Sequence, residues 1–276
     1  MTRSLVARAR INGGVAIAGG HRAWTMRPPF ATVAATMFAA LGAALVVAVA
    51  LGLDAAAIAS VDRLPPAVKA LFQWATRYGK SDWLLVPAAT VMIVVGLGDW
   101  RAVSRVNAAA WHEIAALAGI LFLVVALSGI ATDMVKPLVG RVRPGFASGP
   151  FDFSPLSFAG YRHYSFPSGH ATTAAAVATL ALYVRGSWTV AVVAAAGVVA
   201  VSRVAIGAHW PSDVVGGVFV GVGVSWLVLR ASVAAGVGLR ALPDGRVRWR
   251  TGVLRRIRRS RFALFPGLWL ALRGGG

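Results

Sequence analysis

Long apolar runs separated by short polar segments dominate the chain. A helix needs roughly 20 mostly apolar residues to cross a bilayer core about 30 Å thick. By this measure the pattern predicts six spanning helices, at about Ala31–Leu53, Trp83–Leu97, Ile114–Ala131, Ala171–Val184, Trp188–Ala205 and Val214–Ala231. The fourth run is short unless its ends extend into polar neighbours. We therefore predict an all-α fold, a polytopic membrane helical bundle.

The composition supports a membrane protein. Of 276 residues, 58% are hydrophobic and 13% are charged, and the mean hydropathy is +0.71. Soluble domains carry about a quarter charged residues, so a soluble globular protein is disfavoured. The chain has no cysteine, which excludes disulfides, thiolate metal sites and cysteine nucleophiles.

The basic charge indicates a topology. Lys and Arg number 28 against 9 Asp and Glu, and arginines cluster in residues 1–30 and again after Arg240. The positive-inside tendency places both termini in the cytoplasm, which an even number of spans satisfies. We thus predict a basic segment (1–30), a six-span core (31–231) and a basic tail (232–276), which is either simply solvated or bound to anionic lipid. The position of the charge favours membrane topology over nucleic-acid binding.

One connection contains a further predicted helix. After Pro65-Pro66, apolar residues recur at helical spacing in Ala67–Tyr78, typical of a short helix on the membrane surface. The Arg, Ala, Val and Gly bias suggests a GC-rich bacterial genome and hence a bacterial plasma membrane.

Three polar clusters flank the third to sixth predicted spans. They are Lys136–Pro144, Tyr164–His170 and Ser202–Asp213, and six spans place all three on the outer face. Polar groups near membrane helices are costly, which makes these clusters a hypothesis for a functional site. The clusters contribute three cations, Lys136, Arg143 and Arg203, and guanidinium donors match phosphate oxygens. Ser168 and Gly169, where the fourth span begins, add a hydroxyl and free backbone N–H groups for the same anion.

The histidines supply candidate chemistry. Asp213 follows His209 by four residues, so its carboxylate can hold one ring nitrogen and leave the other free to attack phosphorus. His170, beside Ser168, can protonate the leaving oxygen and later deprotonate a water. A metal bound by His170, His209 and Asp213 is an alternative, but three nearby cations would repel a divalent ion. We therefore predict no metal or other cofactor.

Together these residues resemble the type-2 phosphatidic acid phosphatase superfamily, which includes vanadium-dependent haloperoxidases. The matching motifs are Lys136 with Arg143-Pro144, then Pro167–His170, then Ser202-Arg203 with His209 and Asp213. The resemblance implies a helical bundle and a phosphate pocket. It also implies His209 as nucleophile, Asp213 as its orienting partner and His170 as acid and base, without a metal.

The expected activity is hydrolysis of the phosphate or pyrophosphate head of a membrane lipid through a phosphohistidine. Undecaprenyl diphosphate, phosphatidylglycerol phosphate and phosphatidic acid are the candidate substrates. The haloperoxidase alternative would hold vanadate in this pocket, but those relatives are soluble. A transporter or binding protein for lipid phosphates is the alternative from another class, and it would not require His209, His170 and Asp213 together. The sequence leaves the oligomeric state open.

Overall fold

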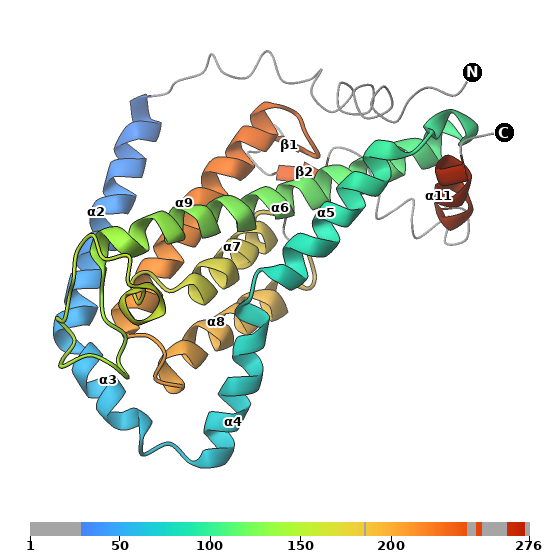
Figure 1. Cartoon of the computed structure of the whole chain (residues 1–276). Helices are drawn as coiled ribbons and strands as arrows, with labels where there is room; N and C mark the ends of the chain where they lie inside the picture. The colour runs from blue at the N-terminus through green and yellow to red at the C-terminus, as the bar shows by residue number, and fades with distance from the viewer. Residues whose placement is uncertain (1–28, 185, 242–246, 250–263, 274–276) are drawn as a thin grey trace. The chain divides into compact units, whose positions relative to one another are not determined.

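The computed structural model describes residues 29–184, 186–241, 247–249 and 264–273. The predicted amino-terminal segment 1–30 therefore lies almost wholly outside the described residues, as does much of the basic tail. Each of the six predicted apolar runs is helical (Figure 1). The corresponding helices are α2 (Pro29–Gly52), α5 (Asp82–Leu97), α6 (Arg105–Val139), α7 (Gly169–Val184), α8 (Thr189–Ala205) and α9 (Pro211–Ala234).

The helices differ in how far they could cross a bilayer. Four segments are long and apolar enough to span one, namely Ala34–Gly52, Pro66–Leu97, Arg105–Val139 and Pro211–Ala234. By contrast α7 and α8 have 16 and 17 residues, about 25 Å of helix. The short fourth run is therefore a short helix, and the fifth is nearly as short. Both meet a polar cluster at one end.

Shorter elements connect the long helices. The surface helix predicted over Ala67–Tyr78 is present as α4 (Pro66–Ala75) continued by a 3-10 turn, η2 (Thr76–Gly79). Its place at the membrane surface stays a prediction. The other short elements are α3 (Asp54–Val61), η3 (Trp100–Ala102), η4 (Gly160–His163) and α11 (Leu264–Arg273). Strands β1 (Leu239–Ala241) and β2 (Val247–Trp249) form an antiparallel pair, and the other regular elements in the described ranges are helical.

The chain divides into two compact units, and the larger one holds the three polar clusters. It comprises residues 27–83 and 124–227. Within it α7 packs along α8, and α8 also contacts α3, α4 and η2. Helix α9 approaches α7 closely at Gly217 and Gly221, where an added Cβ would clash with the carbonyl oxygens of Ser168 and Thr172 respectively. Such contact between small residues is how membrane helices pack without water to drive them together.

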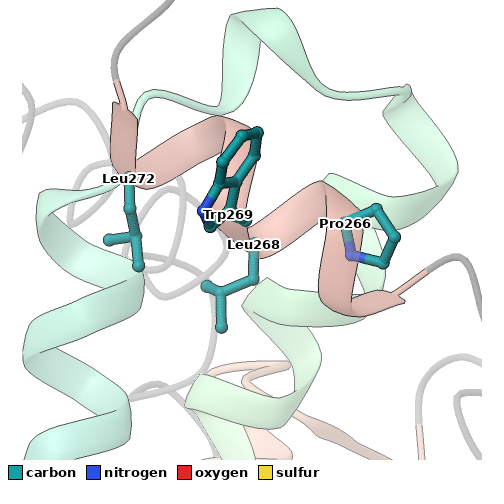
Figure 2. A pocket seen from close by; sticks show the side chains of 4 residues that line it. All are labelled: Pro266, Leu268, Trp269 and Leu272. Carbon is teal, nitrogen blue, oxygen red and sulfur yellow. The ribbon is translucent and has the colours of Figure 1, made fainter.

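Among the described residues, the second unit comprises 84–123, 228–241, 247–249 and 264–273. Its core contains Val95, Trp100, Val103 and Ala271, and the Trp100 indole donates a 2.8 Å hydrogen bond to Val95 O. On α11 a shallow hollow is lined by Pro266, Leu268, Trp269 and Leu272 (Figure 2). Because these four side chains carry no ionisable group, the hollow offers nothing for phosphate chemistry.

Candidate active site

His209 and Asp213 form a buried pair where α8 connects to α9. His209 lies in the turn after α8, and Asp213 lies in the first turn of α9, which brings Nδ1 within 3.5 Å of Asp213 Oδ2. Both side chains are at least 98% buried. The spacing of four residues thus brings the two groups together as expected.

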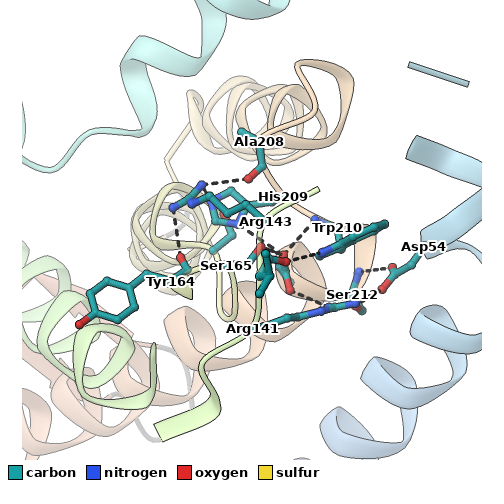
Figure 3. A network of polar contacts seen from close by, with 12 residues as sticks. Asp54, Arg141, Arg143, Tyr164, Ser165, Ala208, His209, Trp210 and Ser212 are labelled. Atoms are coloured by element: carbon teal, nitrogen blue, oxygen red, sulfur yellow. Dashed lines mark hydrogen bonds and ion pairs between the residues drawn. The ribbon is translucent and has the colours of Figure 1, made fainter. Parts of the chain in front are cut away.

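Three further donors hold the Asp213 carboxylate in place (Figure 3). Oδ2 accepts hydrogen bonds from Ser165 Oγ at 2.5 Å and from the Trp210 N–H at 2.9 Å. Oδ1 accepts one from Arg141 Nη1 at 2.7 Å. A carboxylate fixed on both oxygens cannot rotate away from His209, so it sets the orientation of the imidazole.

The opposite nitrogen of His209 faces Arg143. Arg143 Nη1 lies 3.1 Å from His209 Nε2, and a guanidinium can only donate hydrogen bonds. Nε2 must therefore accept, which assigns the ring proton to Nδ1 on the side of Asp213. That tautomer is the one in which Nε2 carries the lone pair needed to attack phosphorus.

The surroundings keep His209 neutral. Burial lowers the pKa of His209 to about 4, and the positive charges of Arg143 and Arg203 act in the same direction, while Asp213 opposes them. An imidazole with this pKa is uncharged and nucleophilic at neutral pH.

The start of α7 lies against this pair. The Ser168 N–H donates a 2.9 Å hydrogen bond to Asp213 O, which ties the α7 amino terminus to α9. Ser168 Oγ is buried and has no hydrogen-bonding partner among the described residues. Lys136 Nζ lies 3.5 Å from where a Cβ on Gly169 would be, although it also pairs with the exposed Asp133 at 2.6 Å. The predicted phosphate-binding groups Lys136, Ser168 and Gly169 therefore lie together.

Arg203, the third predicted cation, enters the site from the end of α8. Its Nη1 donates to Thr76 Oγ1 of η2 at 2.6 Å, whereas its buried Nε has no partner in the described part of the chain. Buried donors without partners are costly, and an anion that accepts from them would remove that cost. Arg203 Nε and Ser168 Oγ are two such donors.

Arg143 makes more hydrogen bonds within the protein than its predicted role in phosphate binding required. Nε donates to Tyr161 O, Nη2 to Tyr164 O, and Nη1 to both Ala208 O and His209 Nε2, at 2.9 to 3.1 Å. The guanidinium also lies over the Tyr161 ring, 3.9 Å from its centroid. A phosphate oxygen would have to take the N–H that now points at His209.

His170 occupies the first turn of α7 near these groups. Arg203, Arg143 and Lys80 are cations near enough for their charge to act on its ring. Gly79 of η2 packs on its ring so tightly that an added Cβ would lie 2.6 Å from His170 Cδ2. The eight predicted site residues therefore gather in one unit, around the ends of α6, α7, α8 and α9.

Two buried charges of the site were missed by sequence reasoning. Arg141 donates to Asp213, and its Nη2 lies 2.7 Å from Asp54 Oδ2 at the start of α3. Asp54 also accepts from Ser212 N at 2.9 Å and Ser212 Oγ at 2.6 Å. Asp54 thus forms hydrogen bonds with both Arg141 and the first turn of α9, and holds them together. The one available signal was an acidic residue directly after the first predicted span.

The contacts of η2 with Arg203 and His170 were also missed, because Thr76 and Gly79 carry no motif. As for metals, no group of three or more His, Asp or Glu in the described ranges is arranged to hold one.

Comparisons with known proteins identify chains to which this one is similar. The family model described as "PAP2 superfamily" matches residues 117–236. Lipid A 1-phosphatase from Rhizobium etli is 32% identical over 186 residues, covering 66% of this chain and 78% of that protein. Lipid A 1-phosphatase from Rhizobium johnstonii is 32% identical over 188 residues, covering 66% and 75%. The crystal structure of a transmembrane PAP2-type phosphatidylglycerolphosphate phosphatase from Bacillus subtilis has 24% identity and a TM-score of 0.49, covering 71% of this chain and 94% of that one.

The apolar helices, the matched family model and the relatives named as phosphatases make this chain a membrane phosphatase of lipids. Its similarity to the Rhizobium enzymes and the match to the family model show that the chain belongs to the PAP2 superfamily.

Proposed function

We propose that this protein hydrolyses a lipid phosphate through a phosphohistidine on His209, without a metal. The tautomer carries the proposal: Nε2 holds a lone pair in the cationic pocket while Nδ1 faces a carboxylate fixed by three donors. A binding protein would gain nothing from fixing the tautomer of a buried imidazole.

The proposed reaction has two steps. First, Nε2 of His209 attacks phosphorus, the bond from phosphorus to the lipid oxygen breaks, and His170, protonated beside the bound phosphate dianion, gives its proton to that oxygen. Burial and the charges of Arg203 and Arg143 lower the pKa of His170 to about 3, so the negative charge of the bound phosphate must supply the opposing shift. Second, His170 takes a proton from water, the water oxygen attacks phosphorus, and the bond to Nε2 breaks. Inorganic phosphate leaves and His209 returns to its starting state.

The cations stabilise the charge that develops on phosphorus. Arg203 Nε, Ser168 Oγ, Lys136 Nζ and the amide of Gly169 are the donors we assign to the phosphate oxygens. Arg143 would exchange its contact with Nε2 for a phosphate oxygen, so substrate binding itself would release the nucleophile.

For the substrate we propose the glycosidic phosphate of a lipid A-type saccharolipid. The support is the 32% identity to two proteins named lipid A 1-phosphatase, over most of their length. Undecaprenyl diphosphate, phosphatidylglycerol phosphate and phosphatidic acid are the other candidates, because their heads offer the pocket the same phosphate oxygens.

The test is phosphate release by detergent-purified protein on these four lipids in the presence of EDTA. We expect wild-type activity to survive EDTA and His209→Ala to lose it, with lipid A turned over fastest. Acid-labile label retained on wild-type protein after brief exposure to ³²P-labelled substrate, and absent from His209→Ala, would mark the phosphohistidine. Full activity in His209→Ala would refute the nucleophile assignment, and loss of activity in EDTA would refute metal independence.

A further inference from the structure

The connection between α6 and α7 exposes an unusual number of large apolar side chains. We call residues 146–161 the apolar loop. Six of its side chains are between 43% and 78% exposed, namely Phe146, Phe151, Phe153, Leu156, Phe158 and Tyr161. Contiguous exposed apolar surface on a folded chain marks an interaction site.

Leu156 is the most informative residue of this loop. Its φ is +59°, in the left-handed region, which is unfavourable for residues other than Gly and Asn. Its side chain is also 67% exposed. Folding alone would favour Gly or Asn here, and exposure to water would disfavour Leu. A leucine that satisfies neither requirement indicates an apolar contact outside the protein.

The occupant that fits this surface is lipid. The Leu156 N–H donates to Leu138 O at 3.4 Å, so the loop folds back against the end of α6. There Met134 and Leu138 are exposed on a helix long and apolar enough to span a membrane. The apolar surface of the loop therefore continues the surface that α6 presents to lipid.

The charges of the loop support the same occupant. Asp152 is its single ionisable group besides the Tyr161 phenol, and Ser148 binds that carboxylate through its N–H at 3.1 Å and its Oγ at 3.3 Å. Arg162 follows directly, at the edge of the apolar surface. Aromatic rings bordered by a cation are typical of the boundary between acyl chains and anionic headgroups.

Two buried arginines connect this loop to the catalytic pair. Arg141 Nη2 donates to Pro150 O at 2.6 Å, and Arg143 Nε donates to Tyr161 O at 2.9 Å. The same guanidiniums contact Asp213 and His209. The position of the apolar loop is therefore linked to the geometry of the site.

We propose that the apolar loop inserts into the lipid surface, with Leu156 and Phe158 in contact with acyl chains. This contact would hold the tail of a lipid substrate beside Arg143, an inference that also rests on the proposed function. The loop would then favour phosphates that reside in a bilayer over the same phosphates dissolved in water.

The absence of native cysteine makes a direct test simple. Leu156→Cys and Phe158→Cys would be labelled with an environment-sensitive fluorophore and reconstituted in nanodiscs containing doxyl-labelled phospholipid. Leu138→Cys on α6 serves as the lipid-facing control. Asp62→Cys, at a carboxylate that is 98% exposed, serves as the water-facing one. We expect both loop positions to be quenched as strongly as position 138. Quenching no stronger than at position 62 would overturn the proposal. Water, a second copy or another protein, rather than lipid, would then cover the loop.

A kinetic test separates lipid contact from damage to the site. Leu156→Asn keeps a residue that tolerates the left-handed region but removes the apolar contact. We expect kcat/KM to fall about tenfold on a long-chain lipid phosphate in vesicles, as for loss of one buried leucine contact. On a short-chain analogue below its critical micelle concentration, kcat/KM should stay within about twofold of wild type.

Ser157→Asn, in the same loop but already polar, is the matched control and should leave both values unchanged. Equal losses on both substrates would mean that the loop acts through the fold, which overturns the proposal. The quenching measurement does not depend on turnover, so it remains informative even if the proposed phosphatase reaction is wrong.

Discussion

At the scale of single residues, the nucleophile combines low basicity with a fixed orientation. Burial and two guanidiniums hold the pKa of His209 at about 4, below the ordinary histidine value of about 6.5. Protonation would block Nε2, so activity should be lost as pH falls through the lower value. We expect the acidic limb of kcat/KM that belongs to His209 to lie near pH 4.

The measurement is kcat/KM from pH 3.5 to 8 on a soluble short-chain phosphate. The second ionisation of the phosphate itself, near pH 6, is titrated separately by ³¹P NMR so that its contribution can be removed. A remaining limb between pH 6 and 7 on which kcat/KM falls as pH falls would show that the site does not shift the pKa of His209.

Asp54 is expected to be a positioning residue, since it contacts Arg141 and Ser212 rather than the reacting atoms. Asp54→Asn keeps the shape and an acceptor for the Ser212 N–H but removes the charge that balances Arg141. We expect kcat to fall by about tenfold with KM nearly unchanged, as for other groups that orient a catalytic residue.

A purely structural role for Asp54 would instead lower the melting temperature and leave kcat per folded molecule intact. Asp62→Asn is the control, because that carboxylate is exposed and its 3.6 Å pair with Lys69 lies at the surface. It should match wild type in both kcat and melting temperature.

The difference between predicted and missed residues has a physical basis. His209 and Asp213 are four residues apart, and Ser168 precedes His170 by two, so spacing along the chain carries their relation. Asp54 meets Arg141 across 87 residues and Ser212 across 158. No local pattern encodes such a contact, and a single acidic residue after an apolar run is equally compatible with an ordinary polar end of a helix.

At the scale of elements, apolar runs predicted the helices because lipid requires an apolar composition along a span. They could not predict which helix Gly217 and Gly221 of α9 would contact, which the structure shows to be α7. Nor could they predict that Gly79 of η2 packs on the His170 ring, because Gly79 has no side chain. Packing between elements depends on contacts between distant parts of the chain, which the pattern of apolar residues does not specify.

The contact between α7 and α9 gives a prediction at this scale. A Cβ at Gly221 would clash with Thr172 O and lie 2.9 Å from the Ala175 side chain, so Gly221→Val must push the helices apart. Separation would strain the bond from Ser168 N to Asp213 O. We expect a loss of about 1–3 kcal/mol in stability, as for overpacked cores, and a reduced kcat.

The measurements are a thermal melt in detergent and phosphate release. Gly129→Val in α6 is the matched control, because nothing lies within 4 Å of an added Cβ there. If the two valine variants behaved alike, the contact between α7 and α9 would not be what positions Ser168.

At the scale of the whole molecule, the arginine-rich ends and the even number of predicted spans lead to one topology. Both termini should be cytoplasmic, and the connections that carry the site should face outward. A site on that face would act on lipids of the outer leaflet. The connections on the predicted outer side also carry Lys and Arg, which weakens the charge bias. The phosphate-binding role proposed for Lys136, Arg143 and Arg203 would account for three of these cations.

Single cysteines in this cysteine-free chain can report the topology. Asp62→Cys lies in the connection after the first predicted span, on the predicted outer face, and Ser104→Cys lies in the connection predicted to be cytoplasmic; both side chains are exposed. In intact bacterial cells, we expect a membrane-impermeant maleimide to label position 62 and to label position 104 only after lysis. Since the six-span prediction fixes the two connections on opposite faces, labelling in the reverse order would invert the topology. Labelling of both before lysis would instead contradict the span count.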